Sequence, residues 1–303
     1  MKHIFVINPR AGKVDRVAEI SALLKKFNGI IDYEIYATKS QGDAREYVNN
    51  YLKEHPENET YRFYACGGDG TLHDVANGAY KYSNAEVAVY ASGSGNDFIK
   101  NFGDSNGFRD LESLIYGKPQ KVDLLRVDDK VCVNIVSFGF DGEVTFAMHR
   151  FKRWPFISGK MAYNLGAVSS LLFKMSAPMK ITIDDEPFFD GKGLLIAVAN
   201  GHTYGGGFRC APKALVNDGI LDICFAKKIS RFRAGGLMSS YKKGEHLTNP
   251  KCKDIIAYRK AKRVKIESNR DVAYQIDGET FRKNGLEIEV LPCAMTFIIP
   301  REC

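Results

Sequence analysis

A glycine-rich run at residues 67–71 is the part of this sequence whose residue types and spacing best fit chemistry. Its members are Gly67, Gly68, Asp69, Gly70 and Thr71. Glycines let backbone N–H groups close around a phosphate, and a helix that begins there adds positive potential. Asp69 repels a phosphate unless Mg²⁺ lies between them, so the run predicts phosphoryl transfer with a metal bridging nucleotide phosphates. The alternative is a tight left-handed turn with a capping aspartate.

Two other polar, turn-rich loops follow apolar runs that are typical of strands. They are residues 8–12 (Asn-Pro-Arg-Ala-Gly) and residues 93–97 (Gly-Ser-Gly-Asn-Asp). In open α/β sheets, ligands gather beyond the carboxyl ends of the strands. We therefore expect the three loops to form one ligand site. Neither the Walker pattern G-x-x-x-x-G-K-[ST] nor the Rossmann pattern G-x-G-x-x-G is present.

The elements that must position these loops follow from hydrophobic periodicity. The first third alternates strand and helix patterns at short spacing, which predicts an α/β domain with a mostly parallel sheet. Its strands are expected at residues 3–7, 33–37, 62–66 and 87–91, and its helices at residues 14–27, 43–53 and 72–82. From about Val122, short β-rich runs predict an antiparallel β-rich sandwich domain. Inserted helices are expected there near residues 143–150, 160–173 and 231–241.

The expected domain boundary lies where the alternating strand and helix patterns give way to short β-rich runs. We expect a nucleotide-binding α/β domain at residues 1–121 and a β-sandwich domain at residues 122–293. The last run, residues 294–303, can complete the first domain or belong to the second.

Composition limits the class of protein. The 303 residues are 45% hydrophobic and 26% charged, which excludes disordered, collagenous and coiled-coil proteins. No apolar stretch approaches the ~20 residues that a bilayer span needs, and the apolar run at residues 4–7 is too short for a signal peptide. Seven cysteines form no C-x-x-C pair, which is typical of free thiols in a reducing cytosol. We expect a soluble, cytoplasmic protein.

The net charge of +7 is unevenly spread along the chain. Residues 1–125 hold 15 Lys/Arg and 17 Asp/Glu, a net of −2, so the remaining residues carry +9. Residues 227–265 contain 13 basic and two acidic residues, a net of +11. A solvated face is the usual meaning of such a run, but this field also suits an anionic partner, either nucleic acid or a membrane surface.

Residues 66–78, which contain the glycine-rich run, resemble the nucleotide motif of the diacylglycerol kinase catalytic-domain family. That family includes bacterial soluble lipid kinases, sphingosine kinases and ceramide kinases, and its superfamily includes NAD kinases and phosphofructokinases. The resemblance continues in order through residues 8–12, 38–44, 93–98, 138–141, 204–207, 212–214, 218–222 and 277–279. It covers nearly the whole chain, and it implies a lipid kinase whose second domain binds the lipid substrate.

The resemblance also implies which residues contact ATP. In relatives the loops at the strand ends hold the nucleotide, so the expected contacts are Asn8, Gly12, Thr38, Gly67, Gly68, Asp69, Gly70, Thr71 and Ser94. Relatives usually have Ser at position 11 and Thr at position 94, so Ala11 loses a hydroxyl and Ser94 keeps one. They often carry Asn-Glu in place of His73-Asp74. These departures affect nucleotide affinity more than the carboxylates that the chemistry needs.

The segment around Asp218 resembles the family's structural Mg²⁺ site, in which one carboxylate and neighbouring backbone carbonyls hold the ion. By position, the carbonyls belong to Leu215 and Ile220. Oxygen-only ligation of this kind is what Mg²⁺ prefers. The alternative for Asp218-Gly219 is a simple turn before the strand at Leu221.

Asp277-Gly278-Glu279 resembles the family's catalytic element, where a carboxylate takes the proton from the lipid hydroxyl. An alcohol that attacks a γ-phosphoryl group needs positioning, charge neutralisation and a nearby base. We favour Glu279 as the base and Asp277 as a metal or water ligand, although relatives leave open which carboxylate acts directly. The alternative for this element is a β-turn with two surface acids.

Further carboxylates are candidates for a metal–water network. The network would join Asp69 and Asp277 to Asp97 and Asp123. Asp97 can equally be the cap of the helix that follows it.

A lipid kinase without a membrane span must reach its substrate at the bilayer surface. Each Lys or Arg near an anionic leaflet is worth about 1 kcal/mol, so the basic second half predicts reversible, peripheral membrane contact. Residues 149–157 (His-Arg-Phe-Lys-Arg-Trp-Pro-Phe-Ile) suit such an interface or an ordinary core or hinge. No nucleic-acid-binding pattern is present. The oligomeric state stays open.

Two other functions stay open. One is a soluble-substrate kinase related to NAD kinase, although the Asn-Asp/Glu pair that holds the NAD ribose has no clear counterpart here. The other is a nucleotide- and lipid-binding protein that has lost catalysis, against which the intact residues 277–279 argue. Diacylglycerol, phosphatidylglycerol, sphingoid bases and other hydroxylated lipids are not distinguished by the sequence.

Overall fold

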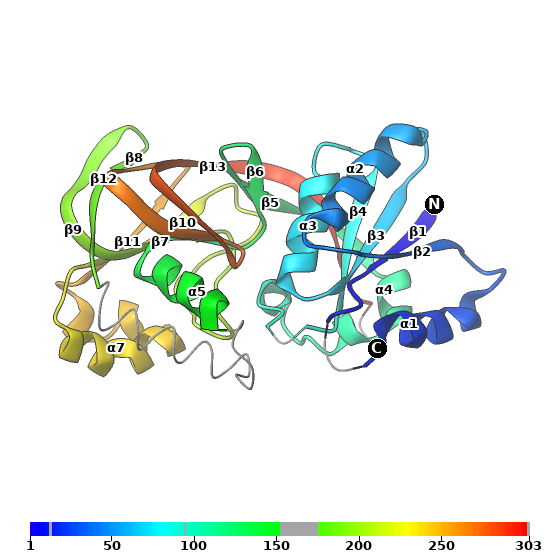
Figure 1. The fold of residues 1–303 in the computed structure, drawn as a ribbon, viewed down its shortest axis with the longest axis horizontal. Coiled ribbons are helices and arrows are strands. Elements are labelled where there is room, and N and C mark those ends of the chain that lie inside the picture. Colours follow the sequence, from blue (N-terminus) through cyan, green and yellow to red (C-terminus); the bar gives the residue numbers. More distant parts are fainter. Residues whose placement is uncertain (12–13, 94, 152–174, 302–303) are drawn as a thin grey trace. The chain divides into compact units, whose positions relative to one another are not determined.

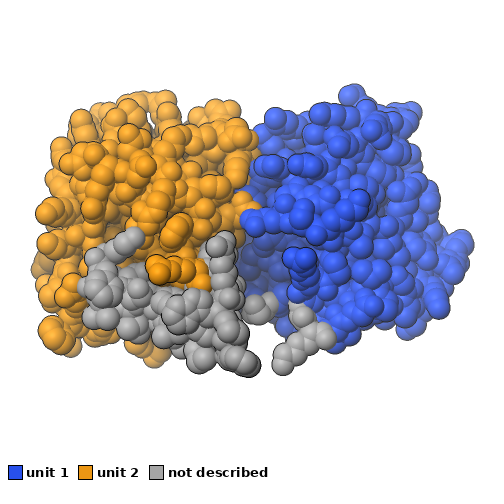
Figure 2. Space-filling model, in the orientation of Figure 1, with its two compact units in different colours: residues 1–124, 216–218, 291–303 blue, residues 125–215, 219–290 orange. Residues whose placement is uncertain are grey.

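The computed structural model describes residues 1–11, 14–93, 95–151 and 175–301. The chain divides into two compact units (Figure 2). Unit 1 comprises residues 1–124, 216–218 and 291–303, and unit 2 comprises residues 125–215 and 219–290. The expected two-domain fold with a β-rich second domain is confirmed.

Unit 1 alternates strands and helices along the chain (Figure 1). Its elements are β1 (Lys2–Ile7), α1 (Arg16–Leu24), η1 (Lys25–Phe27), β2 (Asp32–Ala37), α2 (Asp43–Glu54), β3 (Tyr61–Gly67), α3 (Asp69–Ala79), β4 (Ala85–Ala91), η2 (Phe98–Phe102), η3 (Gly107–Arg109), α4 (Leu111–Ile115) and the start of β5 (Lys118–Val127). Strand β1 pairs in parallel with β2 and β3, and β3 pairs in parallel with β4. All seven residues of β3 are buried, as expected of a strand covered on both faces.

The first helix begins later than its periodicity indicates. Asp15 is its N-cap, because the Asp15 side chain accepts hydrogen bonds from the backbone N–H groups of Val17 and Ala18, each at 3.1 Å. This satisfies two of the donors that the first helical turn leaves unpaired. The last turn tightens into the 3₁₀-helix η1, so α1 is shorter than the expected helix at residues 14–27.

Unit 2 consists mainly of antiparallel strands (Figure 1). Its elements are the end of β5, β6 (Lys130–Cys132), β7 (Ile135–Gly139), α5 (Phe140–Phe151), β8 (Ala177–Ile183), β9 (Glu186–Ala199), β10 (Leu221–Lys227), α7 (Arg231–Lys243), η4 (Glu245–Leu247), η5 (Pro250–Cys252), β11 (Ile256–Ala261), β12 (Arg263–Ile276) and most of β13 (Glu279–Ile299). The helix expected at residues 160–173 lies outside the described residues. No helix in the described ranges is both long and apolar enough to cross a membrane.

Alternating side chains of the unit 2 strands build two separate cores. In β10, Ile223 and Phe225 belong to one hydrophobic cluster, whereas Cys224 and Ala226 belong to the other. A strand points successive side chains to opposite faces, so both faces of this strand are buried. The second cluster also contains Val144 of α5 and packs against Tyr241 of α7. These two helices therefore cover one face of the strands.

Two distant segments join unit 1 through a buried carboxylate. Asp123 is fully buried, and one of its side-chain oxygens accepts a hydrogen bond from the backbone N–H of Cys293 at 2.7 Å. The backbone N–H of Asp123 donates to the carbonyl of Val216 at 2.7 Å. Beyond Cys293, the end of β13 pairs in parallel with β4 at Thr296 and Phe297. Unit 1 thus includes residues 216–218 and the end of the chain.

Candidate functional site

The three polar loops of unit 1 meet where strands β1, β3 and β4 end. The backbone N–H groups of Ser92 and Gly93 both donate to the carbonyl of Gly67 at 3.0 Å, which ties the loop after β4 to the end of β3. The backbone N–H of Asn8 donates to the carbonyl of Cys66 at 3.0 Å. The strands are neighbours in parallel register, so their carboxyl ends share one edge of the sheet.

Gly67 and Gly93 leave no room for a side chain, whereas a Cβ at Gly70 would meet nothing within 4 Å. A Cβ at Gly93 would lie 2.5 Å from the Cα of Gly68, and a Cβ at Gly67 would lie 2.2 Å from Oγ1 of Thr71. The two loops therefore approach each other backbone to backbone. Gly68 has φ −110° and precedes the first residue of α3, so this turn is extended rather than left-handed. Such a loop can present main-chain N–H groups to an anion at the helix start.

Asp69 is the first residue of α3 and links that helix to the loop after β4. Its Oδ1 atom accepts hydrogen bonds from the backbone N–H groups of Asp97 at 2.7 Å and Phe98 at 3.4 Å. The carboxylate of Asp97 instead contacts the ammonium of Lys100 at 2.5 Å. Asp97 is the N-cap residue of the 3₁₀-helix η2, although its side chain makes no capping hydrogen bond to that helix.

The other expected nucleotide contacts of unit 1 lie at the same strand ends. The side-chain amide of Asn8 is 3.5 Å from the hydroxyl of buried Thr71. Thr38 follows β2, and its backbone N–H donates to the carbonyl of Ile7 at 2.8 Å. Gly70 is exposed beside Asp69. Gly12 and Ser94 lie outside the described residues.

In unit 2, Asp277 and Gly278 form the two-residue turn of the hairpin between β12 and β13. Their φ values are 48° and 91°, and Ile276 pairs with Glu279 across the turn. Two consecutive positive φ values, with Asp followed by Gly, are typical of a type I′ hairpin turn. The β-turn alternative is therefore correct as a description of the backbone, and the side chains decide what the turn can do.

The carboxylate of Asp277 is engaged by several donors from the loop between β6 and β7. It accepts backbone hydrogen bonds from Val133 at 2.8 Å, Asn134 at 2.9 Å and Ile135 at 3.2 Å. The Cys132 thiol lies 3.0 Å away, and burial raises the pKa of that thiol, so it stays a donor. Asp277 is thus held in place by four groups, and most of its lone pairs are occupied.

Glu279 is the first residue of β13. Its carboxylate is 3.7 Å from the ammonium of Lys130, and its side chain is 19% exposed. The same ammonium lies 4.1 Å from the centre of the Phe281 ring. Glu279 therefore combines partial solvent access with a nearby positive charge.

Two residues that the sequence analysis did not single out support this hairpin. Buried Gln275 accepts a hydrogen bond from the backbone N–H of Gly278 at 2.6 Å and donates to the hydroxyl of Ser137 at 3.2 Å. Lys130 faces Glu279. A polar glutamine within the apolar run at residues 272–276 is the signal that could have pointed to Gln275, whereas Lys130 has no such signal.

The residues expected to hold a metal divide between the two units, so each is described by itself. Asp218 belongs to unit 1 and is half-buried. In unit 2, Leu215 is 58% exposed and Ile220 is half-buried. The donor set that they offer, one carboxylate and two carbonyls, consists of hard oxygen atoms and fits Mg²⁺ in chemistry. No cluster of three or more His, Cys, Asp or Glu side chains suited to a metal occurs among the described residues.

A half-buried chain of polar side chains in unit 2 joins the motifs at residues 138–141 and 204–207. The Tyr204 hydroxyl donates to Oδ2 of Asp141 and lies 3.2 Å from the Tyr241 hydroxyl. Burial raises the pKa of Asp141 to about 6, although the bond from Tyr204 acts in the opposite direction. Asp141 is the second residue of α5, so this chain attaches α5 to the loop that contains Tyr204.

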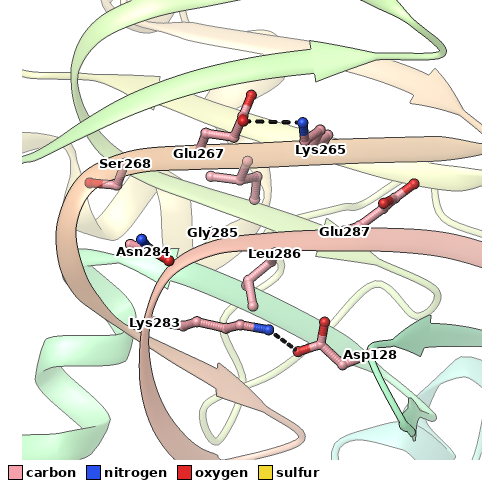
Figure 3. A pocket seen from close by; sticks show the side chains of 10 residues that line it. Asp128, Lys265, Glu267, Ser268, Lys283, Asn284, Gly285, Leu286 and Glu287 are labelled. Carbon is pink, nitrogen blue, oxygen red and sulfur yellow. Dashed lines mark hydrogen bonds and ion pairs between the residues drawn. The ribbon is translucent and has the colours of Figure 1, made fainter.

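A surface pocket of about 300 Å³ lies between β12 and β13, where their register shifts between Glu267 and Val272 (Figure 3). Its charged side chains pair with one another: Lys265 lies 3.1 Å from Glu267, and Lys283 lies 2.8 Å from Asp128. The charges largely cancel, and the pocket contains none of the expected site residues. It therefore has no evident role in phosphoryl transfer.

Comparison with known families identifies the chain. Residues 2–127 match the diacylglycerol kinase catalytic domain, and residues 134–299 match the YegS C-terminal NAD kinase beta sandwich-like domain. The chain belongs to the family in which these two domains follow each other. The resemblance stated from the sequence is confirmed, and with it the expectation of an enzyme of the lipid kinase class.

Individual relatives agree with this assignment. The chain is 27% identical to a protein of Enterobacter sp. (strain 638) named "Probable lipid kinase YegS-like", over 99% of this chain and 96% of that protein. It is also 27% identical to a diacylglycerol kinase of Staphylococcus aureus (strain bovine RF122 / ET3-1), over 90% of this chain and 84% of the relative.

Solved structures share the fold. A diacylglycerol kinase from Bacillus anthracis str. Sterne has a TM-score of 0.71 at 22% identity, covering 98% of this chain and 96% of that one. An NAD kinase from Archaeoglobus fulgidus, solved in complex with ATP, has a TM-score of 0.52 at 12% identity, covering 99% and 94%. At these identities the likeness shows the fold alone.

Proposed function

We propose that this protein is an ATP- and Mg²⁺-dependent kinase that transfers the γ-phosphoryl group to a hydroxyl of diacylglycerol or a similar lipid at a membrane surface. The observation that carries this proposal is the pair of domains that the chain matches, joined to a glycine-rich loop at the strand ends and a carboxylate pair on a hairpin. The relatives named above support diacylglycerol as the substrate class.

In this proposal, the loops of unit 1 bind the nucleotide. Asn8, Thr38 and the run from Gly67 to Thr71 would contact ATP, together with Gly12 and Ser94 from outside the described residues. Support comes from the backbone-to-backbone packing at Gly68 and Gly93, which keeps the loop thin enough for a phosphate to approach main-chain N–H groups. Asp69, whose Oδ1 atom holds the loop after β4, would orient a Mg²⁺ bound to the phosphates.

Glu279 would act as the general base on the lipid hydroxyl. A base must reach the proton that it accepts, and Glu279 retains some solvent access while Lys130 provides a positive charge nearby. Asp277 accepts bonds from three backbone N–H groups and a thiol, so it is better suited to fix the hairpin than to take a proton. We therefore assign Asp277 to positioning, with Glu279 acting directly.

Asp218 and the carbonyls of Leu215 and Ile220 would hold a structural Mg²⁺. Such an ion would neutralise charge on the loop and stabilise its conformation. Its binding is testable by itself, because Asp218→Ala should abolish a Mg²⁺-dependent rise in melting temperature without any substrate present.

We further propose that the protein works as a peripheral membrane protein of the cytoplasm, because a lipid substrate lies at the bilayer surface. The net charge of +11 over residues 227–265 supports contact with anionic lipid. Residues 149–151 end helix α5, and residues 152–157 of the aromatic and basic segment lie outside the described residues.

The test is phosphoryl transfer from labelled ATP to a panel of lipids in mixed micelles with Mg²⁺, with the products resolved by chromatography. Labelled phosphatidic acid, the product of diacylglycerol phosphorylation, supports the proposal, and label on another lipid corrects the substrate. Transfer to NAD without lipid would instead favour a soluble-substrate kinase. ATP binding without transfer to any acceptor would favour a catalytically silent binding protein.

A further inference from the structure

The first turn of helix α7 holds a phenylalanine almost entirely in solvent. Phe232 is 95% exposed, whereas the next most exposed large apolar side chain of the described residues, Ile30, is 62% exposed. A single exposed apolar residue is common on protein surfaces. The surroundings of Phe232 therefore decide whether it has a role.

The packing of α7 keeps Phe232 outward. Buried Ala234 and half-buried Tyr241 are seven residues apart and lie on the face that contacts the core. At 3.6 residues per turn, Phe232, Ser239 and Lys243 lie on a different face. All three are exposed, so rotating the helix to bury Phe232 would expose its core face.

Basic residues are frequent on both sides of this phenylalanine in the chain. Residues 227–253 contain eight basic residues and one acidic residue, Glu245. All eight basic residues are exposed: Lys227, Lys228, Arg231, Arg233, Lys242, Lys243, Lys251 and Lys253. The guanidinium of Arg233 donates to the carbonyl of Lys251 at 3.4 Å, which brings the segment of η5 beside the start of α7. Basic residues of two segments therefore lie near the start of α7, where Phe232 is exposed.

We propose that this surface, which we call the α7 surface (Lys228, Arg231, Phe232, Arg233, Lys251 and Lys253), docks unit 2 onto an anionic lipid bilayer. Its cations would meet the phosphates of the headgroups while Phe232 enters the boundary of the acyl chains. Charge complementarity selects this partner, and a projecting aromatic ring adds an apolar anchor. The proposal deepens the proposed function, because it names the surface by which such a kinase would reach its lipid.

Vesicle binding by the protein tests the α7 surface without any need for activity. Co-sedimentation with vesicles of phosphatidylcholine and phosphatidylglycerol should show binding that added salt weakens, and vesicles of phosphatidylcholine alone should bind much less. Phe232→Ala should weaken partitioning onto the vesicles roughly tenfold, because it removes the apolar area that the ring would bury in the bilayer. The double variant Arg231→Glu/Arg233→Glu should weaken it at least about 25-fold.

Matched controls come from unit 1. Ile30→Ala removes the next most exposed apolar side chain, and Lys25→Glu/Lys26→Glu changes the net charge by the same amount as the arginine pair. Both control proteins should bind the anionic vesicles as the unchanged protein does. All substituted positions are exposed, so melting temperatures should stay within about 2 °C and separate a docking defect from misfolding.

Three outcomes would overturn the proposal. The first is a loss of binding in the unit 1 charge pair as large as in the α7 pair, which would indicate a general charge effect. The second is full vesicle binding by Phe232→Ala and by the arginine pair. The third is binding to a single-stranded RNA that competes with vesicles and does not depend on Phe232, which would make this a polyanion site.

Failure of the proposed function would look different from failure of the docking surface. Transfer to diacylglycerol presented in neutral detergent micelles should be unchanged in Phe232→Ala, while transfer to diacylglycerol in anionic vesicles falls. If no lipid is phosphorylated but vesicle binding still depends on Phe232, the α7 surface stands and the kinase proposal does not. If diacylglycerol in micelles is phosphorylated normally and no variant alters vesicle binding, the kinase proposal stands and the α7 surface does not.

Discussion

Unit 1 and unit 2 prepare their candidate site residues in different ways. In unit 1 the loops depend on glycine. Gly67 and Gly93 have no Cβ, and neighbouring atoms lie in the space that a side chain would fill. In unit 2 a side chain fixes the hairpin turn, because the carboxylate of Asp277 accepts hydrogen bonds from the backbone N–H groups of residues 133–135.

The difference reflects the tasks that we assign to the two units. Fixed main-chain dipoles can hold a phosphate at little reorganisation cost, so a binding loop needs bare backbone. A proton acceptor must be a side chain with a free oxygen, so it needs a neighbour that fixes the turn. Asp277 fills that second role, and the side chain of Glu279 is 19% exposed.

The largest effect is expected for Glu279→Gln, which removes the proposed base. Loss of a positioned general base lowers the rate roughly 10²- to 10⁴-fold, so kcat for lipid phosphorylation should fall within that range. Stability should hardly change, since the side chain is partly exposed and faces Lys130 at 3.7 Å. Initial rates at saturating ATP and lipid measure the effect. Glu287→Gln, on the same strand, is the control, and equal losses in both variants would contradict the assignment.

The next largest effect is expected for Gly93→Ala in unit 1. Its new Cβ would lie 2.5 Å from the Cα of Gly68, a clash between backbones that only movement of a loop can relieve. Overpacking of this kind costs up to about 3 kcal/mol, and the moved loop should raise the KM for ATP. Denaturant unfolding and ATP titration measure the two changes.

Gly236→Ala in unit 2 is the matched control for that change. A Cβ at Gly236 meets nothing within 4 Å, and the residue lies inside helix α7. Alanine should therefore stabilise the protein by about 0.5–1 kcal/mol. Equal destabilisation by both glycine variants would show that close backbone approach is not special to the unit 1 loops.

Asp277→Asn should separate positioning from proton transfer. Asparagine also tolerates a positive φ, so the turn can persist, but the variant loses a charged acceptor that serves three backbone N–H groups. We expect a loss of about 2 kcal/mol in the free energy of unfolding, together with a smaller rate loss than in Glu279→Gln. If Asp277→Asn leaves stability intact and abolishes turnover, Asp277 acts directly and our assignment is reversed.

The smallest expected effect is on the pH dependence of the free energy of unfolding. It should have opposite signs for one group in unit 1 and one group in unit 2. In unit 1, burial and the nearby Arg62 lower the pKa of His3 from 6.5 to about 4, so the unfolded chain takes up that proton first. The stability that neutral His3 contributes is therefore lost as pH falls from 6.5 to 4. In unit 2, burial raises the pKa of Asp141 from 3.8 to about 6, so the folded chain holds that proton and stability is lost as pH rises from 3.8 to 6.

Unfolding curves of His3→Gln and Asp141→Asn between pH 4 and 7 measure these contributions. Relative to each variant, the unchanged protein should gain roughly 1–2 kcal/mol with rising pH for His3 and lose a similar or smaller amount for Asp141. The similar or smaller value for Asp141 follows from its pKa shift, from 3.8 to about 6, against a shift from 6.5 to about 4 for His3. If the stability difference from the variant changed in the same direction with pH for both residues, the burial argument would be wrong for one of the two groups.

Short-range pattern was enough for several elements. The strands at residues 3–7, 33–37, 62–66 and 87–91 match β1, β2, β3 and β4 within two residues at each end. Periodicity succeeds there because polar or turn-forming residues follow these runs, namely Asn8, Thr38, Gly67 and Ser92. It fails at the start of α1, where the side chain of Asp15 caps a helix that the apolar spacing extends by two residues.

The amino-acid sequence by itself determined the residue types at the candidate site, the order of the motifs and the family to which they belong. Only the tertiary structure decided that Asp277 is occupied by the backbone of residues 133–135, and that Asp123 joins residues 216–218 and the end of β13 to unit 1. Likewise, only the packing of Ala234 and Tyr241 against the core shows that Phe232 faces outward, where it is 95% exposed. The reason is that hydrogen bonds and packing between residues far apart in the chain depend on the three-dimensional path of the backbone, whereas local spacing records only neighbours in the chain.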